Sequence, residues 1–274
     1  MIPWFTIPPV WLWHFELDVP TCFAFAGAVM SMVFVRWRAL RAALSAKAAV
    51  DGVFVILVSA FVLGHVFDVL LYRQSEFWTN WRVILPWYYG SCSLGALGGL
   101  LLATAITFRA PRGGIDWRYV DEAALAVLLG LGILRVGCFL GHHHAGRRSN
   151  FVLAVQFPKG ARHDLGLYEA VMVFAILGAV LLLHRRFRGQ RPGLISVGAL
   201  LLYASGRFLL EFLRGDDLEI IGRHSDSRYL GLTGVQYGAL LMVASGAWLL
   251  RSIERSRARL LENSNGRQKL PAVD

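Results

Sequence analysis

The sequence predicts an all-α integral membrane protein with seven transmembrane helices. The chain of 274 residues is 56% hydrophobic and only 17% charged, and its mean hydropathy is +0.51, values that soluble domains rarely combine. Its apolar residues are grouped into runs of about 20, the length that a helix needs to cross the hydrocarbon core of a bilayer. Polar loops with clustered Lys and Arg separate these runs, as is typical of multi-pass proteins.

The apolar runs define the expected elements in chain order. Residues 1–20 contain aromatics, prolines, Glu16 and Asp18 but no Lys or Arg, so they lack the positive leader of a signal peptide and are expected to lie at the membrane interface. We expect spans at about 19–35, 50–72, 84–108, 119–140, 165–184, 194–213 and 232–250.

Two further segments lie outside these spans. The loop 141–164 contains FVLAVQF between Asn150 and Pro158, a short β-like pattern that predicts a small folded cap outside the cytoplasm. Residues 251–274 are rich in Arg, Ser, Asn and Glu, so they are expected to form a charged cytoplasmic tail, as a frayed amphipathic helix or a disordered segment. The transmembrane domain is therefore predicted to cover residues 1–250, with 141–164 as its cap.

The distribution of basic residues predicts the orientation. Most of the 28 Lys and Arg follow the first, third and fifth spans or lie in the tail, so this side is expected to be cytoplasmic. The N-terminus is then outside and the C-terminus inside. The formal net charge of +10 lies in short clusters without interleaved aromatics, a pattern that favours membrane topology and not nucleic-acid binding.

Two arginines interrupt apolar spans. Arg135 lies in the fourth run and Arg207 in the sixth. A guanidinium in hydrocarbon costs at least ~2.5 kcal/mol, so such residues usually face a partner, a cavity or a ligand. Two of them suit an anion such as a phospholipid phosphate. The alternatives are that Arg207 and Glu211, spaced i,i+4, neutralise one another and that Arg135 extends to the interface.

The histidines and cysteines do not predict a metal site. His142, His143 and His144 are consecutive and cannot all face one point on a regular helix, and zinc usually has separated ligands. Three cysteines, Cys22, Cys92 and Cys138, lie in apolar stretches without CxxC spacing and are expected to be buried thiols.

Four ordered motifs resemble the prolipoprotein diacylglyceryl transferases. RVGCFLGHHHAGR is similar to that family's signature GR(I/L)G(N/C)F followed by GR, and ARHDLGLYEA resembles its RHPxQLYE. PGLISVGALLLYASGRFLLEFLRGDD resembles the motif PG…LYGxxRFxxEFxR, and LTGVQYGALLMVASG resembles the closing LSxxQ…G helix. Together these motifs extend along most of the chain.

The resemblance implies a bacterial inner-membrane enzyme without a cofactor. It would move diacylglyceryl from phosphatidylglycerol onto the lipobox cysteine of a preprolipoprotein signal peptide, releasing glycerol 1-phosphate. Its partners would be these two substrates and the surrounding membrane lipids, and the chain is expected to be a monomer. The resemblance assigns catalytic roles to Arg135, Arg207, Glu211, Tyr203 and His163, and substrate binding to Gly146, Arg147, Arg162, Gly95, Gly99 and Arg214.

The chain departs from the family pattern at several positions. The family's HGGLIG block reads LGALGG, so its histidine is Leu94, and the tyrosine of the first-helix WYG is Pro20. Cys138 replaces asparagine in the signature, while Asp164 and Gly166 replace proline and glutamine of RHPxQ. Two alternatives therefore stay open: a paralogue with another acceptor, and a non-catalytic protein that binds anionic lipids. A transporter is disfavoured because we find no repeated halves.

The proposed chemistry sets its own requirements. Attack of a thiolate on a glyceryl carbon displaces a phosphate ester, so the site must neutralise the leaving phosphate and favour loss of the thiol proton. The nucleophile belongs to the substrate, so the enzyme needs none of its own. Candidate bases or orienting groups are His142, His143, His144, His163 and Glu211.

Overall fold

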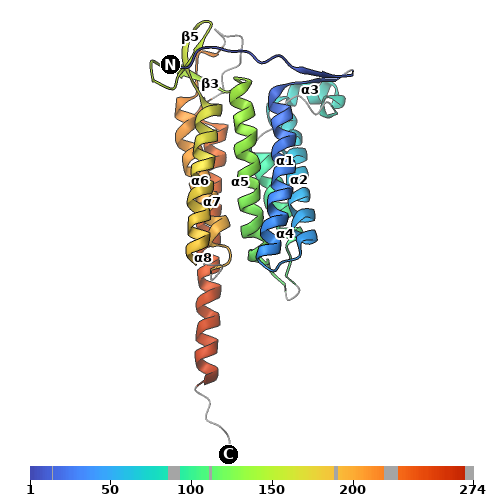
Figure 1. Cartoon of the computed structure of the whole chain (residues 1–274), viewed down its shortest axis with the longest axis vertical. Helices are drawn as coiled ribbons and strands as arrows, with labels where there is room; N and C mark the ends of the chain where they lie inside the picture. The colour runs from blue at the N-terminus through green and yellow to red at the C-terminus, as the bar shows by residue number, and fades with distance from the viewer. Residues whose placement is uncertain (14, 86–92, 111–112, 188–190, 219–227, 269–274) are drawn as a thin grey trace, which may run out of the picture.

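Long helices that run in alternating directions form a bundle with a small β-sheet at one end (Figure 1). The structure is a computed structural model and describes residues 1–13, 15–85, 93–110, 113–187, 191–218 and 228–268. The long helices are α1 (Val19–Arg41), α2 (Ala46–Tyr72), α4 (Ser93–Thr107), α5 (Trp117–Leu140), α6 (Leu165–Phe187), α7 (Leu194–Leu210) and α8 (Gly234–Gln268). Two short helices, α3 (Gln74–Thr79) and η1 (Trp81–Ile84), follow α2, and η2 (Glu211–Leu213) follows α7.

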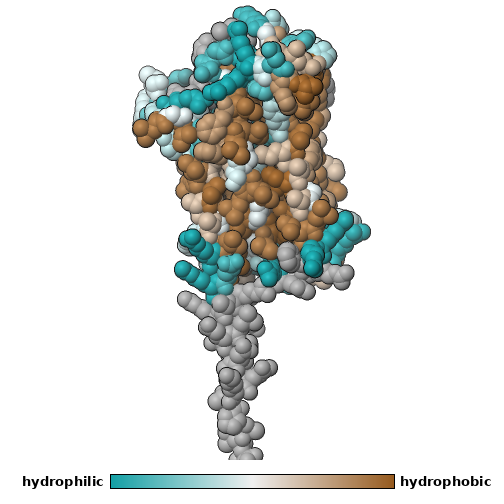
Figure 2. Space-filling view, turned by 90° about the vertical axis from the view of Figure 1, so that its left-hand side faces the viewer, coloured by the Kyte–Doolittle hydropathy of each residue, from teal (hydrophilic) through white to brown (hydrophobic). Residues whose placement is uncertain are grey.

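Five of these helical segments are long and apolar enough to cross a membrane. They are Val19–Arg41, Ala46–Leu71, Trp117–Leu140, Leu165–Arg186 and Leu194–Leu213. Figure 2 shows the corresponding hydrophobic band between two hydrophilic ends. The prediction of a multi-pass, mostly helical membrane protein is confirmed. Residues 86–92 of the third expected span, which include Cys92, lie outside the described residues.

Side chains at the helix starts fix the boundaries of α1 and α2. Asp18 accepts a hydrogen bond from the Thr21 backbone N–H at 3.0 Å at the start of α1, where Pro20 occupies the first turn. Ser45 caps α2 in the same way, at 3.3 Å from the Ala48 nitrogen. The last helix, α8, continues past the expected end of the seventh span at 250 as one helix to Gln268, so part of the expected tail is helical.

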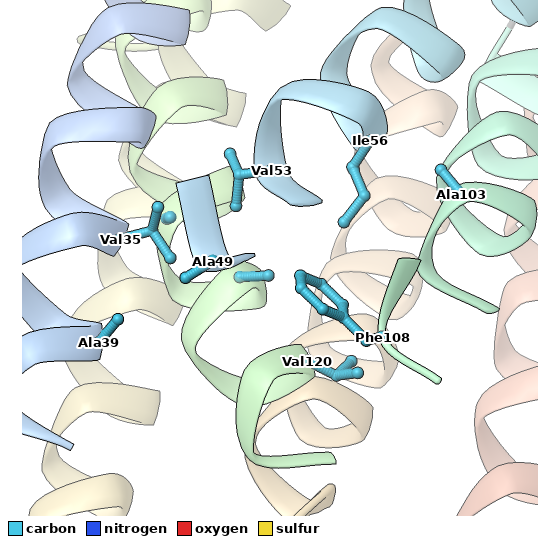
Figure 3. Close-up of a cluster of buried hydrophobic side chains, with 10 residues drawn as sticks. Val35, Ala39, Ala49, Val53, Ile56, Ala103, Phe108 and Val120 are labelled. Atoms are coloured by element: carbon cyan, nitrogen blue, oxygen red, sulfur yellow. The ribbon is translucent and has the colours of Figure 1, made fainter. Parts of the chain in front are cut away.

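Small residues let neighbouring helices approach closely. A side chain at Gly27 or Gly130 would collide with the other residue's backbone, so these glycines set the contact between α1 and α5. At the same contact Ser31 Oγ donates to the Ala126 carbonyl oxygen at 2.8 Å. Figure 3 shows the apolar cluster at the end of the bundle away from the cap, which includes Val35, Ala39, Ala49, Val53, Ile56, Ala103, Phe108 and Val120.

A three-stranded antiparallel sheet forms the cap. Its order is β3 (Ala145–Arg148), β5 (Gly160–Asp164), β4 (Val155–Phe157). The expected strand in FVLAVQF is wrong in its first half, because the chain turns there and the Ala154 N–H donates to the Phe151 carbonyl at 2.9 Å. The N-terminus joins the sheet through a parallel bridge between Ile2 and Val155.

Two hairpins complete the cap end. The expected interfacial lead-in contains β1 (Val10–Leu12) and β2 (Phe15–Leu17), which pair antiparallel just before α1. The strands β6 (Arg228–Tyr229) and β7 (Leu232–Thr233) pair directly before α8. Four helix ends lie beneath the cap: the C-terminal ends of α5 and α7 and the N-terminal ends of α6 and α8 (Figure 1).

Candidate functional site

Both intramembrane arginines meet one carboxylate beneath the cap. Arg135 of α5 places Nε 3.1 Å from Glu169 Oε1 of α6, and Arg207 of α7 places Nε 3.7 Å from Glu169 Oε2. The Glu169 side chain is 3% exposed, against 17% for Arg135 and 9% for Arg207. Glu169 therefore bridges two guanidiniums that come from different helices, and neither arginine extends to the interface without a partner.

A second buried carboxylate extends this network. Arg207 Nη1 donates to Glu211 Oε2 at 2.6 Å, which confirms the i,i+4 pair that the spacing suggests. Glu211 Oε1 accepts from Arg214 Nε at 3.3 Å and from Thr233 Oγ1 at 3.2 Å. With these contacts Glu211 is fully buried and acts as a counter-ion for two arginines, an arrangement that does not suit a general base.

Guanidiniums and carboxylates lie together in this network. The guanidiniums are those of Arg135, Arg207 and Arg214, and the carboxylates are those of Glu169 and Glu211. Guanidiniums bind phosphate oxygens through paired N–H groups, and they do so more strongly where water is scarce. The two central guanidiniums are therefore of the right chemistry to bind a phosphate that enters beneath the cap.

Tyr203 orients the bridging carboxylate. Its hydroxyl donates to Glu169 Oε1 at 2.7 Å. The tyrosine comes from α7, one helical turn before Arg207, so the same helix supplies both groups. Cys138 lies near the other arginine, where Arg135 Nη1 is 4.0 Å from its Sγ. The expectation of a buried thiol is confirmed for Cys138, whereas Cys22 on α1 is only half-buried.

The three consecutive histidines have different partners because the chain leaves α5 at this point. His142, in a left-handed conformation with φ 51°, places Nδ1 2.9 Å from Asp164 Oδ2. His143 is exposed, with its Nε2 4.0 Å from Asp18 Oδ2. His144 places Nε2 3.1 Å from Arg135 Nη1. Their side chains therefore do not converge on a common point.

His163 and Arg147 belong to the cap surface. His163 Nδ1 lies 2.8 Å from the Tyr168 hydroxyl, and its ring packs near Phe151 with centroids 6.1 Å apart. Arg147 on β3 is exposed. The hydrogen bond of His163 is with Tyr168, its ring contacts are with Tyr168 and Phe151, and its Cβ lies against Gly146, so it stands on the cap side of the arginine network.

Arg162 and Gly146 attach the cap to the chain that follows α7. Arg162 is fully buried, and its Nη1 and Nη2 donate to the two oxygens of Asp217 at 2.6 and 2.7 Å. These bonds are the main reason that the pKa of Asp217 lies below its usual value. Arg162 Nη1 also donates to the Gly146 carbonyl at 3.0 Å. A side chain at Gly146 would lie 2.5 Å from the Leu213 carbonyl oxygen, so glycine is needed there for close packing.

The predicted glycines of α4 have a packing role. A Cβ at Gly95 would collide with the Leu63 carbonyl, and one at Gly99 would collide with the Ser59 carbonyl, both on α2. The structure therefore places Gly95 and Gly99 at a helix contact, apart from the arginine network.

Sequence reasoning missed Glu169 as the link between the arginines. The residue stands in the motif ARHDLGLYEA, where it is an acidic side chain near the start of an apolar span. An intramembrane carboxylate is as unusual as an intramembrane arginine, so the two kinds of anomaly should have been paired.

These features define a multi-pass membrane protein with a buried arginine–carboxylate network beneath a small cap. The sequence profile of the prolipoprotein diacylglyceryl transferase family matches residues 12–251. The chain belongs to this family, which confirms the resemblance.

Three relatives show how far the similarity extends, and each is named phosphatidylglycerol–prolipoprotein diacylglyceryl transferase. The protein of Mesorhizobium japonicum is 28% identical over 245 residues, covering 82% of this chain and 83% of the relative. That of Pasteurella multocida is 29% identical over 232 residues, covering 79% and 85%. That of Brucella ovis is 32% identical over 205 residues, covering 72% and 70%.

Proposed function

We propose that the protein transfers the diacylglyceryl group of phosphatidylglycerol to the lipobox cysteine of a prolipoprotein. The observation that carries this proposal is the bridge from Arg135 through Glu169 to Arg207, which holds two guanidiniums from different helices close together beneath the cap. Membership of the family, and the substrates in its relatives' names, support the same activity.

The reaction exchanges one bond for another. The substrate thiolate attacks the glyceryl carbon, a C–S bond forms, and the C–O bond to the phosphate breaks, so glycerol 1-phosphate leaves with the electron pair. Arg135 and Arg207 would bind the phosphate and neutralise the charge that develops on it. Tyr203, Glu169 and Glu211 hold the two arginines in place through the contacts described above.

The thiol proton needs a separate acceptor. Glu211 is occupied by two arginines, so we assign this role to His163 on the cap. Partial burial lowers the pKa of His163, so its ring is neutral near pH 7 and can accept a proton. The acceptor peptide would then approach from the cap side and the lipid from the bundle.

An in vitro assay tests the activity. With phosphatidylglycerol and a lipobox peptide, the native chain is expected to form the thioether product, and Leu94→His is expected to change the rate by less than ~tenfold, because the phosphate-binding arginines do not depend on that position. No product from either protein would favour the non-catalytic alternative. Product from Leu94→His alone would show that the native site has lost its chemistry, and transfer to a different acceptor only would favour the paralogue.

We also propose seven spans in a monomer of the bacterial inner membrane, with the N-terminus and the cap outside. The 15 residues of α4 and the apolar first half of α8 would be the two spans beyond the five long helices. Basic residues at the end of α1, the start of α2, the end of α6 and the start of the tail lie away from the cap, which supports a cytoplasmic location for that end of the bundle.

Cysteine labelling tests this orientation. In a chain with its three native cysteines changed to serine, Ser149→Cys in the cap is expected to react with an impermeant maleimide in intact cells. Lys47→Cys, whose parent side chain is 84% exposed at the other end, should react only after permeabilisation. The reverse pattern would invert the proposed topology.

A further inference from the structure

His144 contacts the same arginine that we assign to phosphate binding. The residue follows the end of α5 and precedes β3, and its Nε2 lies 3.1 Å from Arg135 Nη1. A guanidinium can only donate hydrogen bonds, so Nε2 must be the acceptor. The ring proton is therefore on Nδ1, and the imidazole is neutral.

The charges around His144 oppose its protonation. Burial, and then the guanidiniums of Arg135 and Arg214, hold its pKa well below the usual value. Arg207 of α7 and the neighbouring His143 act in the same direction. Glu169 of α6 contacts the Arg135 guanidinium at Nε, 3.1 Å from Oε1.

Glu169 and His144 consequently act on Arg135 in different ways. Glu169 brings a negative charge, which lowers the attraction of Arg135 for an anion while it holds the Nε edge. The imidazole of His144 fixes Nη1 without any charge of its own. A neutral acceptor of this kind holds the guanidinium in place without neutralising its positive charge, which can then attract an anionic ligand.

We propose that His144 is a positioning residue for diacylglyceryl transfer, which fixes the Arg135 guanidinium as an uncharged hydrogen-bond acceptor so that it can receive the lipid phosphate. This inference rests on the proposed function. It also assigns a role to one member of the histidine cluster, and it excludes His144 as the base through Nε2 as long as the bond to Arg135 is present.

Substitution at His144 tests the role, with the exposed His143 next to it as a matched control. His144→Leu removes the acceptor and is expected to lower kcat at least ~tenfold, the effect of losing one bond to a charged group. His144→Gln supplies an uncharged acceptor and is expected to retain kcat within ~threefold of the native value. His143→Leu should leave transfer unchanged. Native kcat in His144→Leu, or equal losses in the Leu and Gln variants, would overturn the proposal.

The pH dependence of thermal stability provides a readout that does not require transfer. In the unfolded chain His144 takes up a proton near pH ~6.5, whereas the folded protein resists protonation until lower pH, so folding stability decreases as pH falls below that value. Because glutamine does not titrate, the Tm of His144→Gln in detergent should fall less between about pH 6.5 and 5 than the Tm of the native protein. Equal decreases would contradict a neutral His144 against Arg135. Inactivity of the native chain would instead count against the proposed function, and the Tm comparison would still decide the role of His144.

Discussion

Alanine at Arg135 or at Arg207 is expected to lower the rate of diacylglyceryl transfer by at least ~tenfold and up to ~hundredfold. A bond to a charged group contributes about 1.5–3 kcal/mol, and its loss is felt most in a water-poor site where charge develops on a leaving phosphate. Lysine should restore little of the rate, because it keeps the charge but loses the planar pair of donors. The measurement is kcat for both alanine and both lysine variants.

The remaining contacts of the network should limit the loss of folding stability in Arg135→Ala and Arg207→Ala. Without Arg207, Glu211 keeps its bonds to Arg214 and Thr233. Without Arg135, Glu169 keeps the Tyr203 hydroxyl at 2.7 Å and Arg207 at 3.7 Å. Each carboxylate therefore retains a positive partner, so the alanine variants should still insert and fold.

Arg38 provides a control for a purely structural effect. It lies at the opposite end of the bundle with 13% of its side chain exposed, and it makes a two-pronged contact with Glu122 of α5, whose second bond is 3.2 Å. Arg38→Ala should lower the Tm in detergent without lowering kcat of the folded protein. Near-native kcat in Arg135→Ala or Arg207→Ala would remove that arginine from the proposed site.

Hydropathy explains how much of the fold was predictable. Apolar run length indicates where a membrane helix can lie, but it placed the start of the second span at about 50, whereas the Ser45 cap starts α2 at Ala46. The strand in FVLAVQF was overextended because its apolar pattern does not reveal the turn that Phe151 and Ala154 form. The positions of the helices were therefore predicted more accurately than the strand of the cap.

Site residues could be predicted only where the evidence for them lay within the sequence of a single helix. Arg135 and Arg207 are energetic anomalies in their own spans, and the Arg207–Glu211 pair follows from i,i+4 spacing. The bridge through Glu169 joins three helices, so no spacing within a single helix can indicate it. The sequence also does not reveal which loop residues are buried. Arg162 lies in a basic loop and was expected to bind substrate, yet it is fully buried and pairs with Asp217.

Glutamine at Glu169 is expected to have the largest combined effect on activity and stability. The amide keeps the size of the side chain but removes the negative charge that Arg135 and Arg207 share. The two guanidiniums would then repel each other at a site where Glu169 is only 3% exposed, and breaking a buried pair in this way costs about 3–5 kcal/mol. We expect kcat to fall at least ~tenfold, because neither arginine is held against the phosphate, and the Tm to fall clearly.

Glu122→Gln separates the catalytic part of this effect from the structural part. Glu122 is the equally buried partner of Arg38 at the other end of the bundle, so its loss should lower the Tm and leave kcat unchanged. Glu169→Gln and Glu122→Gln would then differ in kcat while they resemble each other in stability. Native kcat in a folded Glu169→Gln protein would mean that the two arginines do not need their shared carboxylate for transfer. In that case Tyr203, whose hydroxyl reaches Oε1 at 2.7 Å, would lose its assigned role as well.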